Sequence, residues 1–174
     1  MKDILECEIF VFDLDRTLFD TYDVSGRKIW AKQLVPPYYF DETTDTITDD
    51  VGNICTLRKS VRGLLNQLHT SGKRISFLSM GAIKGYPTRY QPSYQALAVF
   101  GILKFFDKKI LLYREDKKSE NFTFPKNKLC AFFDDSPEQL VDVLSKYPHV
   151  RTVDSSDESF FDRLLRSVHE LSSI

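Results

Sequence analysis

Five short apolar runs are spread along the chain, at residues 8–12, 74–78, 109–113, 129–133 and 149–153. Each run is nearly continuous in hydrophobic residues. This pattern is typical of parallel strands that are buried on both faces of a sheet. We therefore expect each run to form one strand of a parallel sheet.

Helical patterns lie between these runs. Apolar side chains recur at helical spacing over residues 61–68, 96–100, 140–144 and 160–171. Strands that alternate with helices favour an α/β fold, a doubly wound (Rossmann-like) parallel sheet with helices on both faces. In such a fold, ligands bind at the carboxyl ends of the strands.

The stretch 18–57 does not follow this alternation. It is aromatic, contains Pro36 and Pro37, and includes Asp-Thr-Ile-Thr-Asp-Asp-Val-Gly-Asn-Ile-Cys-Thr at 45–56, which predicts a β-hairpin. We interpret 18–57 as a loop and β-hairpin insertion after the first strand, within a single domain that spans 1–174. The insertion is too short for a large cap domain, so we expect a comparatively open site.

Composition narrows the function classes. The 174 residues include 24 basic and 25 acidic side chains, and this balance argues against general binding to nucleic acid or to a membrane surface. No apolar run approaches the ~20 residues of a membrane helix, and residues 1–8 lack the apolar stretch of a signal peptide. We therefore expect a cytoplasmic protein, in which any site for a charged ligand is local.

Polar residues follow four of the predicted strands at the point where each strand ends. Two pairs of acidic residues are among them. Because adjacent acidic residues also occur elsewhere, at Asp49 and Asp50, the position of these two pairs directly after apolar strands carries more weight than the pairs themselves. The carboxyl ends of parallel strands share one edge of the sheet, where we expect these side chains to meet. They are Asp13 and Asp15 after the first strand, Ser79 at the second, Lys117 and Lys118 after the third, and Asp134 and Asp135 at the fourth.

Clustered carboxylates at one edge need a cation. At an effective dielectric near 20, a phosphate dianion beside two carboxylates about 4 Å away meets a repulsion on the order of 16 kcal/mol. The set contains oxygen donors and no histidine or cysteine, which favours a hard ion. Mg²⁺ fits best, because it also bridges to phosphate oxygens.

These residues resemble the motifs of a known superfamily. Residues 11–18 are similar to the first motif of the haloacid dehalogenase superfamily, a hydrophobic strand followed by DxDxT. Residues 78–79 resemble its second motif and 132–135 its fourth. The hairpin, Thr56-Leu57-Arg58 and Tyr113-Arg114-Glu115 further resemble the eukaryotic-type magnesium-dependent phosphatase family, over residues 9–153 in all.

The resemblance implies a two-step hydrolysis. Asp13 attacks phosphorus and becomes an aspartyl phosphate, while Asp15 protonates the leaving oxygen and then activates water. Mg²⁺ is held by the Asp13 carboxylate, the Asp15 backbone carbonyl and Asp135, with Asp134 close by.

The resemblance also implies the phosphate contacts. Ser79 hydrogen-bonds a phosphoryl oxygen, and a lysine neutralises both that oxygen and Asp13. Lys118 fits this role best because it precedes Phe122 by four residues, and Lys117 is the alternative. Thr17 either supports the loop or is an ordinary turn hydroxyl. After Ser79 the chain departs from its relatives, with Met-Gly-Ala where Arg-Thr is common.

The expected function is therefore a magnesium-dependent phosphomonoester hydrolase. Its substrate is a phosphorylated small molecule, such as a sugar phosphate, or a phosphoprotein, such as a phosphotyrosine protein. A receiver-like phospho-aspartate switch is an alternative, although receivers carry the acceptor after the third strand, where this chain has Tyr113-Arg114. A phosphomutase of the same superfamily is a second alternative. The residues at 84–90, after Ser79, either contact substrate or face solvent.

Overall fold

The computed structural model describes residues 2–157 and 159–172, which form two β-sheets and the helices around them. Within these residues, no helix combines the length and the apolar character that crossing a lipid bilayer requires. Along the chain the helices (α, or η for 3₁₀) and strands are α1 (Lys2–Leu5), β1 (Ile9–Phe12), β2 (Phe19–Tyr22), β3 (Lys28–Ile29), η1 (Ala31–Gln33), β4 (Tyr39–Asp41), β5 (Thr46–Thr48), β6 (Ile54–Leu57), α2 (Val61–Thr70), β7 (Arg74–Ser79), η2 (Thr88–Tyr90), α3 (Pro92–Val99), η3 (Leu103–Phe105), β8 (Lys108–Leu111), α4 (Lys118–Asn121), β9 (Cys130–Asp134), α5 (Pro137–Lys146), β10 (Arg151–Asp154) and α6 (Phe160–Ser172).

The first sheet is parallel and has the order β10-β9-β1-β7-β8. Its five strands are the five apolar runs of the sequence, with bounds that differ from the predicted ones by no more than two residues. The predicted α/β class is thereby confirmed. β1 lies at the centre, between β9 and β7, so the residues after these three strands are neighbours.

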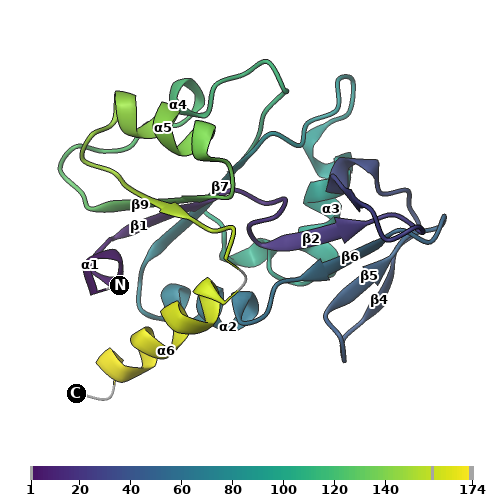
Figure 1. Ribbon diagram of the computed structural model, residues 1–174, viewed down its shortest axis with the longest axis horizontal. Coiled ribbons are helices and arrows are strands. Elements are labelled where there is room, and N and C mark those ends of the chain that lie inside the picture. Colours follow the sequence, from purple (N-terminus) through teal and green to yellow (C-terminus); the bar gives the residue numbers. More distant parts are fainter. Residues whose placement is uncertain (1, 158, 173–174) are drawn as a thin grey trace.

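Helices cover both faces of this sheet (Figure 1), as the sequence predicted. Side chains alternate between faces along a strand, so Phe10 and Phe12 of β1 point to one core while Ile9 and Val11 point to the other. The Phe10 side packs against α2, α3 and α6, and the Ile9 side packs against α5. Burial of β1 on both faces explains why its sequence is continuously apolar.

The insertion after β1 builds a second, antiparallel sheet with the order β3-β2-β6-β5-β4. The predicted hairpin is confirmed as β5 and β6, but it supplies only two of the five strands. β2 pairs with β6, and Phe19 lies opposite Leu57, so the insertion begins and ends at the same place. Figure 1 shows this sheet beside the parallel one.

Asp49 organises the turn between β5 and β6. Its buried carboxylate accepts hydrogen bonds from the backbone N–H groups of Val51 and Asn53 and from the Asn53 side chain. It also accepts one from the N–H of Val35, at 2.8 Å. The hairpin turn therefore fixes the segment that follows η1.

Arg58 links the two sheets. The Nε atom of this buried side chain donates to Asp20 of β2 at 2.9 Å, and NH1 donates to the carbonyl of Ser155, after β10, at 2.7 Å. Burial alone raises the pKa of Asp20, but the hydrogen bonds and charges of Arg58 and then Lys28 outweigh it and lower the pKa below its ordinary value. The pair therefore stabilises the ionised carboxylate.

We expect Asp20→Asn to destabilise the protein by about 3 kcal/mol at neutral pH, because it leaves the buried Arg58 guanidinium without its carboxylate. The folded-state pKa of Asp20 is lower than the unfolded one, so its contribution is complete above the unfolded pKa of ~3.9 and disappears as the pH falls through the folded value. Urea unfolding at several pH values should show the gap between wild type and variant closing in acid. Asp23→Asn, which removes the partner of the exposed Arg27, is the control and should change little.

Candidate active site

Three adjacent strands bring polar side chains to one edge of the parallel sheet. Asp13 directly follows β1, Ser79 is the last residue of β7, and Asp134 is the last residue of β9. All three are buried, at 5%, 2% and 1% exposure. Since hydrogen-bonded strands lie about 4.8 Å apart, the sheet itself sets the spacing of these groups.

The loop after Asp13 turns back sharply. The carbonyl of Leu14 accepts hydrogen bonds from the N–H groups of Thr17 and Leu18, and Arg16 adopts a left-handed conformation with φ of 62°. The fully buried hydroxyl of Thr17 lies 2.8 Å from that of Ser155. Thr17 therefore fastens the loop to the segment after β10, a contact between residues far apart in the sequence that no local pattern indicates.

Asp15 is held by the insertion. Its Oδ1 accepts a hydrogen bond from the backbone N–H of Ala31 at 2.6 Å, and the side chain is only 3% exposed. The sequence carries no signal for this contact, because a backbone N–H can come from any residue. The contact fixes the Asp15 carboxyl group, which is not a member of the carboxylate cluster described below.

Lys118 reaches two of the aspartates. Its Nζ lies 2.5 Å from Oδ1 of Asp13 and 2.6 Å from Oδ2 of Asp134, and the side chain is 2% exposed. Lys117, the alternative, is exposed at the start of α4. α4 is fixed in turn because the N–H and the hydroxyl of Ser119, the next residue, both donate to Asp142 of α5. The sequence did not indicate this support.

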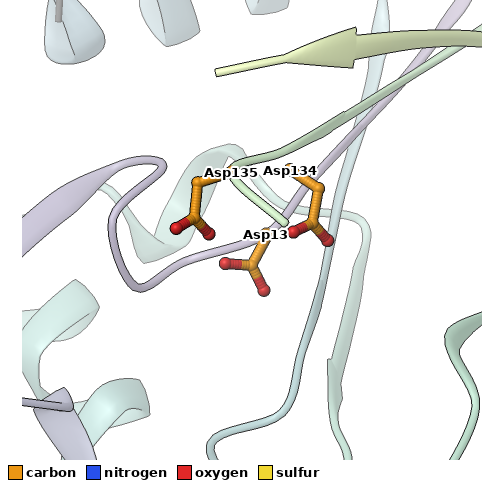
Figure 2. Close-up of side chains that lie close together, drawn as sticks. All are labelled: Asp13, Asp134 and Asp135. Carbon is orange, nitrogen blue, oxygen red and sulfur yellow. The ribbon is translucent and has the colours of Figure 1, made fainter. Parts of the chain in front are cut away.

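Carboxylate oxygens of Asp13, Asp134 and Asp135 all lie within 4.8 Å of one another. Figure 2 shows the three carboxyl groups gathered around one space. At this separation and an effective dielectric near 20, each pair of charges repels by about 3 kcal/mol. Three negative charges against the one positive charge of Lys118 leave the cluster with an excess of two, which a divalent cation would neutralise.

The repulsion and the burial are visible in the pKa values. Burial raises the pKa of Asp15 to about 7, the charges of Asp13 and Asp135 add to this, and the Ala31 N–H opposes it. Burial, and then the charge of Asp13, raise the pKa of Asp134 to about 7 against the effect of Lys118. The pKa of Asp135 is raised by the same two causes. Burial lowers the pKa of Lys118, but Asp13 and Asp134 outweigh it, and the net shift is upward.

The donor set fits Mg²⁺. Carboxylate oxygens are the ligands that this hard ion prefers, and they converge here from two adjacent strand ends. The Asp15 side chain lies outside the cluster, so only its backbone carbonyl remains for the role that the family resemblance implies. Ser79 lies on the opposite side of β1 from Asp134, at the end of β7.

The aromatic side chains of the insertion divide between two environments. Tyr38 and Phe40 pack against the main core, whereas Trp30 is 43% exposed and stacks against the guanidinium of Arg16 at 4.4 Å. Arg16 lies in the loop between Asp15 and Thr17. The Arg16–Trp30 pair therefore lies beside the acidic cluster, and most of the other insertion aromatics stabilise the fold.

Comparison with known proteins finds solved structures of similar fold. No family model matches the chain, and no curated protein matches it. An uncharacterized protein from Listeria monocytogenes serotype 4b is 14% identical, with a TM-score of 0.50 over 95% of this chain and 99% of that one. The N-terminal part of the protein BF1531 from Bacteroides fragilis, described as containing a phosphatase domain complexed with Mg, is 17% identical, with a TM-score of 0.52. That alignment covers 96% of this chain and 43% of the Bacteroides chain, and at these identities both structures show the fold alone.

Mg²⁺ should bind the carboxylate cluster in the absence of substrate. Binding at 100 times Kd contributes about 2.7 kcal/mol, which raises the Tm of a chain of this size by about 5–10 °C. Asp135→Asn should raise the Tm of the ion-free protein, because it removes a repelled charge, and should reduce the Mg²⁺-dependent rise. Thermal unfolding with and without Mg²⁺ measures both effects. Asp50→Asn, the same change on an exposed turn, is the control, and an undiminished Mg²⁺ shift in Asp135→Asn would contradict the assignment.

Proposed function

We propose that the protein is a magnesium-dependent phosphomonoester hydrolase of the haloacid dehalogenase type that acts through an aspartyl phosphate on Asp13. The observation that carries this proposal is the cluster itself. The buried Asp13 carboxylate contacts Lys118 and faces two further carboxylates, those of Asp134 and Asp135. A fourth carboxyl group, that of Asp15, is two residues away in the sequence. This combination supplies a nucleophile, a cation site and an acid at one sheet edge.

Two further facts support the proposal. The residues that resemble the first, second and fourth motifs of the superfamily lie at neighbouring strand ends, which is the arrangement their chemistry requires. The Bacteroides fragilis structure, which has a similar fold, is described as a phosphatase domain with Mg. The magnesium-dependent phosphatase family is the narrower resemblance that we carry into this proposal.

In the first half-reaction, a carboxylate oxygen of Asp13 attacks the phosphorus atom of the substrate in line with the ester oxygen. The new bond joins an Oδ of Asp13 to phosphorus, and the bond between phosphorus and the ester oxygen breaks. Protonated Asp15 gives its proton to the departing ester oxygen, so the product leaves as an alcohol. The hydrogen bond from Ala31 keeps the Asp15 carboxyl group in place for this transfer.

In the second half-reaction, Asp15 acts as a base. It takes a proton from a water molecule as the water oxygen attacks the same phosphorus atom, and the bond to Asp13 breaks. Inorganic phosphate is released, Asp13 returns as a carboxylate, and Asp15 is again protonated. Two aspartates therefore complete the cycle without any net change in the protein.

The remaining groups bind and orient the phosphoryl group. Lys118 holds Asp13 by Oδ1 and is close enough to neutralise a phosphoryl oxygen, while the Ser79 hydroxyl donates to another. Mg²⁺, held by Asp13, the Asp15 carbonyl and Asp135 with Asp134 alongside, would supply positive charge to the phosphoryl oxygens. Thr17 keeps the loop that carries both aspartates against Ser155.

Asp13→Asn should abolish turnover, lowering kcat by at least ~10³-fold, because the amide is not a nucleophile. Removal of Mg²⁺ with a chelator should abolish turnover of the wild type, and added Mg²⁺ should restore it. Release of phosphate from 4-nitrophenyl phosphate over many turnovers measures both effects.

Asp50→Asn serves again as the matched control, since it makes the same chemical change outside the cluster. Full activity of Asp13→Asn, or of the wild type in chelator, would refute the mechanism. A single stable phosphorylation without phosphate release would instead identify a receiver-like switch. A phosphomutase would be identified with a hexose phosphate, by transfer of the phosphoryl group to a second hydroxyl, which 4-nitrophenyl phosphate lacks.

Lys118→Met should lower kcat/KM by about 10²–10³-fold, because it removes charge from both Asp13 and the phosphoryl group. Lys117→Met alters the neighbouring, exposed lysine and should remain close to wild type. Circular dichroism in the presence of Mg²⁺, which offsets the lost ammonium charge, establishes that Lys118→Met is folded. Equal losses in the two variants would contradict the role of Lys118.

A further inference from the structure

A cleft of about 610 Å³ lies between two segments that are distant in the sequence. One wall is formed by η1 and the residues after it, and the other by the loop between β7 and α3. The side chains that face each other across it are mostly apolar or aromatic. They include Leu34, Val35 and Pro36 on the first wall and Ile83, Tyr86 and Tyr90 on the second.

Both walls are close in sequence to residues of the candidate active site. The first begins at Lys32, next to Ala31, whose N–H binds the Asp15 carboxyl group at 2.6 Å. The second begins at Ile83, four residues after Ser79 at the end of β7. One wall therefore starts one residue from the N–H that holds Asp15, and the other starts four residues along the chain from Ser79.

The second wall is held in one conformation. Gln91 is 3% exposed, and its side chain accepts a hydrogen bond from the N–H of Ile83 and donates to the carbonyls of Ile83 and Tyr86. α3, which begins at Pro92, packs against η1 and so joins the two walls. A cleft formed by fixed walls binds without the cost of ordering a loop.

The first wall is fixed in the same way. The N–H of Val35 donates a hydrogen bond to the Asp49 carboxylate, and the carbonyl of Val35 accepts one from the N–H of Asp50. The hairpin turn thus holds Val35 at the edge of the cleft, where its side chain is 42% exposed. Tyr86 and Tyr90 are 56% and 48% exposed on the other side. Large apolar side chains that remain exposed in a cleft are typical of a ligand site.

We infer that this cleft binds the alcohol portion of the substrate, and that this portion is bulky and mainly apolar. The inference rests on the proposed function and narrows it. Sugar hydroxyls need several hydrogen-bond partners, whereas most of the cleft lining is proline, aliphatic or aromatic; its polar groups are those of Lys32, Gln33 and Gln95 and the two tyrosine hydroxyls. Its volume lies in the range that accommodates drug-sized ligands, larger than one phenol ring.

Two substitutions test the cleft through substrate selectivity. Val35→Trp fills it and Tyr90→Ala removes part of one wall, so each should lower kcat/KM for 4-methylumbelliferyl phosphate by about 10-fold or more. Phenyl phosphate, which is smaller, should change by less than about 3-fold. Each substrate is compared with itself across variants, so differences in intrinsic reactivity cancel. Tyr39→Ala removes an exposed tyrosine outside the cleft and should leave both substrates unchanged.

A binding measurement separates this inference from the proposed function. Calorimetry with 4-methylumbelliferone, the alcohol alone, requires no turnover, and we expect binding to the wild type that Val35→Trp abolishes. No binding to the wild type, or equal binding by Val35→Trp, would overturn the inference. Turnover of phenyl phosphate with equal losses on both substrates would also overturn it and leave the hydrolase assignment intact. Binding without any turnover would support the cleft and refute the hydrolase.

Discussion

Repulsion among the carboxylates of Asp13, Asp134 and Asp135 is the constraint that the surrounding structure has to overcome. Their oxygens lie within 4.8 Å of one another in a buried setting, where charges are weakly screened. Lys118 offsets part of the repulsion with contacts to Asp13 and Asp134, and the Ser119–Asp142 hydrogen bonds keep it there. The negative charge that remains lies in front of a packed core. Phenylalanines of β1 and β9 stack there, with the ring centroids of Phe12 and Phe133 4.6 Å apart, and so hold the two strands together.

Ser155 connects the site to the rest of the molecule. Its hydroxyl meets Thr17, its N–H donates to the carbonyl of Asp134, and its carbonyl accepts from Arg58. One fully buried residue after β10 therefore connects the loop after β1, the end of β9 and the β2–β6 end of the second sheet. The position of Asp13 relative to Asp134 thus depends on contacts that extend well beyond the sheet edge.

The sequence predicted the parallel sheet well because strands buried on both faces are apolar at every position, as 9–12 and 130–133 are. Because parallel strands end at a common edge, it also indicated that Asp13, Lys118, Asp134 and Asp135 meet, as they do. It did not predict most of the second sheet, because β2, β3 and β4 are only two to four residues long and Phe19 pairs with Leu57 across the whole insertion. The sequence did not predict the cleft either, because segments 32–36 and 83–92 become neighbours only through the packing of α3 on η1.

The pairing of β2 with β6 closes the insertion at its base, so the chain leaves the parallel sheet and returns to it at nearly the same point. Changes in length or composition at β4 and at the turn between β4 and β5 can therefore be absorbed without displacing β1 from β7. Because the insertion is closed at its base, variation in its sequence is separated from variation in the parallel sheet. Residues at the far edge of the second sheet can diversify, while Asp13 and Asp134 stay anchored to the parallel sheet.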